Sequence, residues 1–222
     1  MKKCEIVSLG LNCLPRKVLT RGGIKPRKAE GELSCPFDLV SHPAEVVLKC
    51  LKTNFEGYFD DLYFKLRKKC FFDFRGKGLW LKEDGTKFFH DKDCKKNDRE
   101  KFVQRVNRRI ENFNKIIEAE RPIVFVMTIY SLIDCLDEIY ETLKTLRKDK
   151  PFEFVVIAFG VSPIISNKNI NVLELALPDK NFVKIWNGTA YVNSKLGKYV
   201  EKTICDFVQA RVDRITVQDM WG

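Results

Sequence analysis

A cysteine near the start of the chain stands where a reactive thiol is expected. The largely apolar run from Cys4 to Gly10 leads into Asn12-Cys13-Leu14-Pro15, which predicts a strand, a tight turn and a helix start. The free N–H groups and the dipole of a helix N-terminus favour an anion, so a thiol there loses its proton more easily. Cys13 is therefore the best candidate nucleophile, and backbone N–H groups around Asn12 and Leu14 would hold an oxyanion.

An imidazole base for this thiol must come from one of two histidines, His42 and His90. His90 ends a predicted strand, and we take it as the base, with an edge-strand surface histidine as the alternative. His42 precedes a proline at a predicted helix entry, which favours a loop histidine. Asp38, in Pro36-Phe37-Asp38, is the predicted partner that orients His90, and its alternative role is a turn residue that bonds its own backbone.

Cofactor and metal chemistry receive little support from the motifs. His90 and Cys94 have a spacing that could suit a metal, but no convincing third ligand accompanies them, so we discount zinc. The chain contains no Gly-x-x-x-x-Gly-Lys-Ser/Thr loop, no Gly-x-Gly-x-x-Gly and no Gly-x-Ser-x-Gly elbow. We therefore expect no metal and no cofactor.

A long helix is predicted over residues 98–120. One apolar stripe runs along it, formed by Phe102, Val106, Ile110, Phe113 and Ile117. At about 100° per residue, Arg109 falls on the shoulder of this stripe, whereas Arg108 points nearly opposite. A guanidinium at the edge of a core face should seek a carboxylate or a ligand anion, so Arg109 is a candidate ligand-binding residue. The alternative is a structural ion pair or a side chain that extends to solvent.

The remaining pattern predicts an α/β fold, with a mainly parallel sheet flanked by helices and a β-hairpin insertion. We expect one α/β domain over residues 1–222, with an inserted aromatic and basic region at about 53–95 that contains a hairpin around Asp84-Gly85. Strands and helices alternate along the second half of the chain. The expected strands are Ile123–Met127, Phe154–Ile157, Val172–Leu175 and Ile215–Val217, and the expected helices are 131–147 and 192–210.

Ligands of such sheets bind beyond the carboxyl ends of the strands. Cys13, Tyr130–Ser131 and Gly160–Ser162 all follow predicted strands, so we expect them on one rim. Ser131 is a candidate ligand contact there. Arg21, which opens a basic loop over residues 21–28, is another.

Composition narrows the classes of protein. The formal charge of +10 suggests an acidic partner, but the basic residues are spread along the chain, which favours a compositional bias that places lysines on solvated faces. The eight cysteines are scattered without a Cys-x-x-Cys pair, which favours free thiols in a reducing compartment. No stretch approaches the roughly 20 apolar residues of a membrane helix, and no export signal is evident, so we expect a cytoplasmic protein without a membrane partner.

Several short motifs together resemble a known family. Ser8-Leu9-Gly10-x-Asn12-Cys13, Pro36-Phe37-Asp38 and Phe89-His90-Asp91, followed by the arginine-rich helix and the strand Ile123–Met127, are similar to a family of largely uncharacterised proteins labelled putative papain-like cysteine peptidases. The likeness covers roughly the first 130 residues. It implies that Cys13 is the nucleophile and that His90 is the base.

The leading hypothesis is a cysteine-dependent hydrolase or acyl transferase that acts on a carbonyl-containing substrate of unknown identity. A second hypothesis is a non-catalytic protein, such as one of a glycan pathway, that binds an anionic ligand at the rim through Arg109 and the loop that begins at Arg21. A nucleic-acid binder is the weakest hypothesis, because no recognised motif accompanies the charge.

Overall fold

A four-stranded parallel sheet forms the centre of the fold. The computed structural model describes residues 4–66, 78–90, 98–148, 150–176 and 192–218. The sheet contains β1 (Glu5–Ser8), β4 (Ile123–Ile129), β5 (Phe152–Phe159) and β6 (Ile170–Leu175), in the order β1-β4-β5-β6. The predicted α/β class with a mainly parallel sheet is therefore confirmed.

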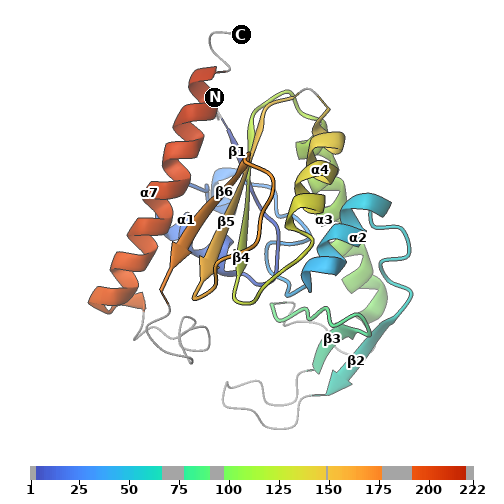
Figure 1. Cartoon of the computed structure of the whole chain (residues 1–222). Helices are drawn as coiled ribbons and strands as arrows, with labels where there is room; N and C mark the ends of the chain where they lie inside the picture. Colours follow the sequence, from blue (N-terminus) through green and yellow to red (C-terminus); the bar gives the residue numbers. More distant parts are fainter. Residues whose placement is uncertain (1–3, 67–77, 91–97, 149, 177–191, 219–222) are drawn as a thin grey trace.

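Helices cover both faces of this sheet (Figure 1). One face packs against α1 (Leu14–Arg21) and α7 (Lys195–Gln218), and the other packs against α2 (Ala44–Thr53), α3 (Arg99–Glu118) and α4 (Leu136–Arg147). Successive residues of β4 point to opposite faces of the sheet. Val124 and Val126 pack in the core beneath α1 and α7, whereas Phe125 and Met127 pack in the core beneath α2, α3 and α4. All residues of β4 are buried, as expected for a central parallel strand.

Residues expected to form a last strand belong to a helix. The prediction of a strand over Ile215–Val217 is wrong, because α7 continues to Gln218. Ile215 is buried beside Val208 in the core between α7 and the sheet, so it extends the apolar stripe of the helix. Thr216 fits the helix because its hydroxyl donates a hydrogen bond to the backbone oxygen of Val212 at 2.8 Å.

The antiparallel hairpin sheet pairs different strands from those expected. The turn at Asp84-Gly85 forms, with Gly85 at a positive φ of 90° and the N–H of Lys82 donating to the oxygen of Thr86. However, β3 (Gly78–Lys82) pairs along its length with β2 (Leu62–Leu66). The expected second strand contributes two isolated bridges at Lys87, one to Leu81 of β3 and one to Ser41, and the N–H of Phe88 donates to the oxygen of Trp80 at 3.1 Å. Figure 1 shows this small sheet beyond the carboxyl ends of the parallel strands.

Two further features complete the description of the fold. A short 3-10 helix, η1 (Lys28–Glu30), lies between α1 and α2. No helix within the described ranges is both long enough and apolar enough to cross a bilayer.

Candidate functional site

Cys13 lies at the junction of β1 and α1. The strand ends at Ser8, the thiol residue immediately precedes the first helical residue, Leu14, and Pro15 occupies the first turn of α1. Proline is suited to that position because its missing N–H would have no partner inside the helix. The predicted sequence of strand, turn and helix is confirmed, and the Cys13 side chain is half-buried.

Asn12 joins this turn to the end of β4 through its side chain. Its Oδ1 accepts hydrogen bonds from the backbone N–H of Leu14 at 2.8 Å and from the hydroxyl of Thr128 at 3.2 Å. Its Nδ2 donates to the hydroxyl of Tyr130 at 3.0 Å. The Leu14 N–H, which we predicted to hold an oxyanion, therefore already has an acceptor within the protein.

The segments that follow β1, β4 and β5 meet at the carboxyl rim of the sheet. Tyr130, one residue beyond β4, contacts Asn12 and stacks on Phe159 with ring centroids 5.3 Å apart and an interplanar angle of 12°. Gly160 follows Phe159 and donates its N–H to the oxygen of Leu175 at 2.8 Å. Ser131 lies next to Tyr130 and is exposed.

The tyrosine at this rim is protonated at neutral pH. Burial raises the pKa of Tyr130 to about 12, while hydrogen bonds with Asn12 and Thr128 act in the opposite direction. The charge of a Cys13 thiolate raises the pKa of Tyr130 as well. The phenol therefore keeps its proton at neutral pH and can donate a hydrogen bond as well as accept the one from Asn12.

The turn over residues 10–13, which we call the Cys13 turn, packs directly on the segment of Pro36-Phe37-Asp38. A Cβ placed on the buried Gly10 would lie 3.1 Å from the backbone oxygen of Phe37 and 3.3 Å from Nδ1 of His42. The rings of Phe37 and His42 also contact edge to face, with centroids 5.3 Å apart. Two of the sequence motifs, far apart in the chain, are thus in contact.

The third motif is attached to the same segment. Ser41 and Lys87 exchange two backbone hydrogen bonds, of 3.0 and 2.8 Å, and Phe88 packs edge to face against His42 with centroids 6.5 Å apart. Phe88 is buried, and His90 follows two residues later in a turn, where it is half-buried. The role of His90 as the base remains a prediction.

His42 lies in the core rather than in an exposed loop. Its Nε2 is 2.6 Å from the hydroxyl of Tyr58, and its side chain is surrounded by aromatic rings, including those of Phe37 and Phe88. Burial lowers the pKa of His42 to about 3, so the ring is neutral at neutral pH. The sequence placed this histidine at a helix entry and gave no signal of its burial.

Asp38 belongs to a buried group of four charges that we call the ion quartet: Arg16, Lys25, Glu32 and Asp38. Arg16 pairs with both carboxylates, and Lys25 pairs with Glu32 at 2.6 Å and lies 3.7 Å from Asp38. Asp38 also accepts a hydrogen bond from the N–H of Cys35 at 2.7 Å, and Lys25 donates to the oxygen of Ile6 in β1.

The ion quartet gives Lys25 and Asp38 partners inside the protein. Lys25 is 2% exposed although it lies in the basic loop over residues 21–28, which we considered as a ligand-binding segment. Asp38 faces cations of the quartet, so its predicted role in orienting His90 remains a prediction. The contacts instead connect α1, β1 and the segment after Cys35, the three pieces that surround the Cys13 turn.

The remaining predicted ligand contacts lie elsewhere. Arg21 is exposed and forms an ion pair with Glu201 of α7. Arg109 is half-buried and Arg108 is exposed, which agrees with the helix phase that we predicted. Roles of Arg21, Arg109 and Ser131 in ligand binding remain predictions.

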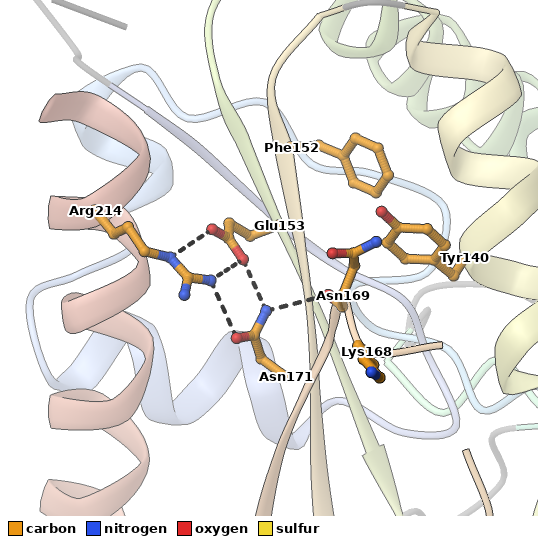
Figure 2. Close-up of a pocket in the computed structure, with 7 residues that line it drawn as sticks. All are labelled: Tyr140, Phe152, Glu153, Lys168, Asn169, Asn171 and Arg214. Carbon is orange, nitrogen blue, oxygen red and sulfur yellow. Dashed lines mark hydrogen bonds and ion pairs between the residues drawn. The ribbon is translucent and has the colours of Figure 1, made fainter. Parts of the chain in front are cut away.

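A pocket of about 360 Å³ lies at the opposite, amino end of the strands (Figure 2). Glu153 accepts hydrogen bonds from Arg214 at 2.9 and 2.6 Å and from Asn171 at 2.7 Å, and Asn171 accepts from Arg214 at 3.1 Å. Tyr140 and Phe152 form the other side. Because these polar groups satisfy one another, the network connects α7 to β5 and β6 without requiring a ligand.

Metal binding finds no support in the described ranges, where no group of three or more His, Cys, Asp or Glu side chains could hold an ion. Cys94, the possible partner of His90 in a metal site, lies outside the described residues. The half-buried thiol of Cys13 stands at a helix start, and its role as a nucleophile remains a prediction.

The architecture is that of an α/β/α protein with a cysteine between its first strand and first helix. Residues 4–160 match the family described as "Putative papain-like cysteine peptidase (DUF1796)". The chain belongs to this family, which confirms the family that its sequence was expected to resemble. No curated protein and no solved structure matches the chain.

Proposed function

We propose that the protein is a cysteine-dependent hydrolase or acyl transferase, with Cys13 as the nucleophile and His90 as the base. One observation carries the proposal: the Cys13 turn packs on the segment of Phe37 and His42, which is hydrogen-bonded to the segment that ends in His90. The three motifs therefore belong to one assembly. The family description, which names a peptidase, supports the same class of chemistry.

The chemistry requires one acyl transfer and one hydrolysis. His90 would take the proton of the Cys13 thiol, and the thiolate would attack the carbonyl carbon of the substrate, forming a C–S bond. Collapse of the tetrahedral intermediate would expel the leaving group, an alkoxide or an amine that receives the proton from His90. Water would then cleave the thioester, releasing the acid and restoring the thiol; another acceptor in place of water would give a transferase.

Other residues would position these groups. Asn12 holds the Cys13 turn against β4, and the N–H of Cys13 lies at the same helix start, where it can donate to an oxyanion. Asp38 would act through the ion quartet, which fixes α1 relative to the segment of Phe37 and His42. His42, neutral and bonded to Tyr58, would serve packing rather than proton transfer.

Acylation by 4-nitrophenyl acetate tests the proposal without knowledge of the natural substrate. We expect release of nitrophenolate together with transient acetylation of the peptide that contains Cys13, detected by mass spectrometry. Cys13→Ser should abolish this acetylation, and His90→Gln should slow it by about 100-fold or more, the usual range for loss of a positioned base.

Cys205→Ser is the matched control, since it removes another half-buried thiol and should leave acetylation unchanged. Acetylation that is spread over several thiols, or that is absent from Cys13, would overturn the enzyme proposal in favour of a non-catalytic binding protein. An unchanged rate in His90→Gln would overturn only the role of His90.

A further inference from the structure

The hydrogen bonds of Asn12 fix the direction in which its amide points. The Leu14 backbone N–H can only donate, so the atom of Asn12 that faces it at 2.8 Å must be the oxygen. The NH₂ group of Asn12 therefore faces Tyr130, whose hydroxyl accepts this hydrogen bond at 3.0 Å. The phenol's own proton is not used in the contact with Asn12. The other hydrogen-bond partner of the phenol is Thr128, whose hydroxyl donates to Asn12 and so can accept the proton of Tyr130.

The same arrangement removes a donor from the Cys13 site. Attack of a thiolate on a carbonyl places negative charge on the carbonyl oxygen, which acyl-transfer enzymes stabilise with fixed hydrogen-bond donors. Leu14 cannot supply such a donor while its N–H is bonded to Asn12. The tyrosine bonded to the same asparagine carries a proton that could take this place.

Tyr130 is held rigidly at the rim where the substrate would bind. It follows the buried strand β4, stacks on Phe159 and is bonded to the residue that precedes Cys13. The oxygen of Tyr130 is therefore fixed before the reaction, and only its O–H bond must rotate, away from Thr128 and toward the oxyanion.

We propose that Tyr130 is a catalytic residue of the Cys13 site, whose hydroxyl, held by Asn12, donates a hydrogen bond to the oxygen of the carbonyl that Cys13 attacks. This inference rests on the proposed function. During attack, the C–S bond forms and the π electrons of the carbonyl move to its oxygen, which accepts the hydrogen bond from Tyr130. The tyrosine keeps its proton, and the hydrogen bond weakens again when the leaving group departs.

Two reactions of the same thiol separate this role from a structural one. Acylation by 4-nitrophenyl acetate passes through an oxyanion, whereas alkylation by iodoacetamide displaces iodide from a saturated carbon and forms none. We expect Tyr130→Phe to slow acylation of Cys13 by about 100-fold, as for loss of an oxyanion donor. Alkylation of Cys13 should stay within about twofold of the wild-type rate, as expected for removal of an oxyanion donor alone.

Two other variants complete the experiment. Tyr140→Phe is the matched control: Tyr140 lies on α4 and lines the pocket at the amino end of the strands, so its replacement should change neither reaction. Asn12→Ala should slow both reactions, because Asn12 also holds the first turn of α1 and the end of β4.

The outcomes separate the two proposals. Equal slowing of acylation and alkylation in Tyr130→Phe would show a structural role and overturn the catalytic one, as would unchanged acylation. Absence of Cys13 acylation in the wild-type protein would overturn the proposed function itself, and with it any catalytic role of Tyr130.

Discussion

Burial separates the thiols of this chain by their readiness to ionise. Cys35 and Cys50 lie in the core, and burial raises the pKa of both, that of Cys50 to about 12. Burial also raises the pKa of Cys135, and it raises the pKa of Cys205 to about 11. These thiols are almost entirely protonated at neutral pH, and a protonated thiol is a poor nucleophile.

Cys13 should therefore react fastest among the described cysteines. Competitive alkylation with a limiting amount of iodoacetamide at pH 7.5, followed by peptide mass spectrometry, should label Cys13 at least about tenfold faster than Cys205, given the thiolate dependence of the reaction. Denatured protein provides the reference, because unfolding should bring all rates close together. A rate for Cys13 among the slowest would remove it as the nucleophile.

His42 should make the stability of the fold depend on pH. The pKa of His42 is lowered from 6.5 to about 3 by burial, so between these values the unfolded chain binds a proton that the folded chain does not. Stability is therefore full above pH 6.5 and falls as the pH decreases. At about 1.4 kcal/mol per pH unit, the loss between pH 6.5 and pH 5 is about 2 kcal/mol.

Urea unfolding of the wild type and of His42→Gln measures this contribution. The free energy of unfolding should fall more steeply between pH 7 and pH 5 in the wild type, because the glutamine takes up no proton. The comparison concerns the slopes, so the lost contact with Tyr58 does not affect it. Parallel slopes would show that His42 titrates alike in both states.

At the scale of elements, the ion quartet determines how α1 is held against the segment of Asp38. Arg16 is 13% exposed and pairs with two carboxylates that are each 2% exposed or less. Arg21 lies on the same helix, yet its side chain is 37% exposed and its pair with Glu201 is at the surface. The two arginines thus provide a comparison within one helix.

Arg16→Met should destabilise the protein by about 3–5 kcal/mol, since it leaves two buried carboxylates with Lys25 as the one remaining cation of the quartet. Arg21→Met should cost at most about 1 kcal/mol, the usual range for an exposed ion pair. Urea unfolding at pH 7.5 measures both changes. Similar small effects would mean that the quartet carries little of the stability of this region.

The local sequence pattern predicted most helices and strands, but not which segments they pair with. The apolar stripe of α3 and the proline at the start of α1 give direct physical signals, and both helices form where expected. The turn at Asp84-Gly85 also forms, and the chain after it bridges to Leu81 of β3 as expected, but it also pairs with Ser41, and the longest pairing of β3 is with β2. Such choices depend on contacts between distant segments, which a local pattern does not contain.

At the scale of the whole molecule, the candidate site is built from segments far apart in the sequence. Cys13 could be proposed from its helix start, because that signal is local. The burial of Lys25 and His42 and the contact of Asn12 with Tyr130 could not, because each depends on how β1, β4 and the loops meet. The short motifs showed which segments to compare, and the fold shows which of their atoms are in contact.

Gly10 tests this assembly at its closest contact. A Cβ at this position would lie 3.1 Å from the oxygen of Phe37 and 3.3 Å from Nδ1 of His42, distances at which the neighbours must move. Gly10→Ala should therefore destabilise the protein by about 1–3 kcal/mol, as other overpacked sites do. It should also change the alkylation rate of Cys13, because the displaced turn carries the thiol.

Ser8→Ala is the control in the same stretch of chain. Ser8 is buried and its hydroxyl has no hydrogen-bond partner among the described residues, so its removal should be neutral or stabilising. Urea unfolding and Cys13 alkylation should be measured on both variants. An alanine that has enough space stabilises a protein relative to glycine, because it reduces the conformational freedom of the unfolded chain. If Gly10→Ala were stabilising, the turn would therefore not be in contact with Phe37 and His42. The shared assembly of the three motifs, on which the proposed function depends, would then lose its first link.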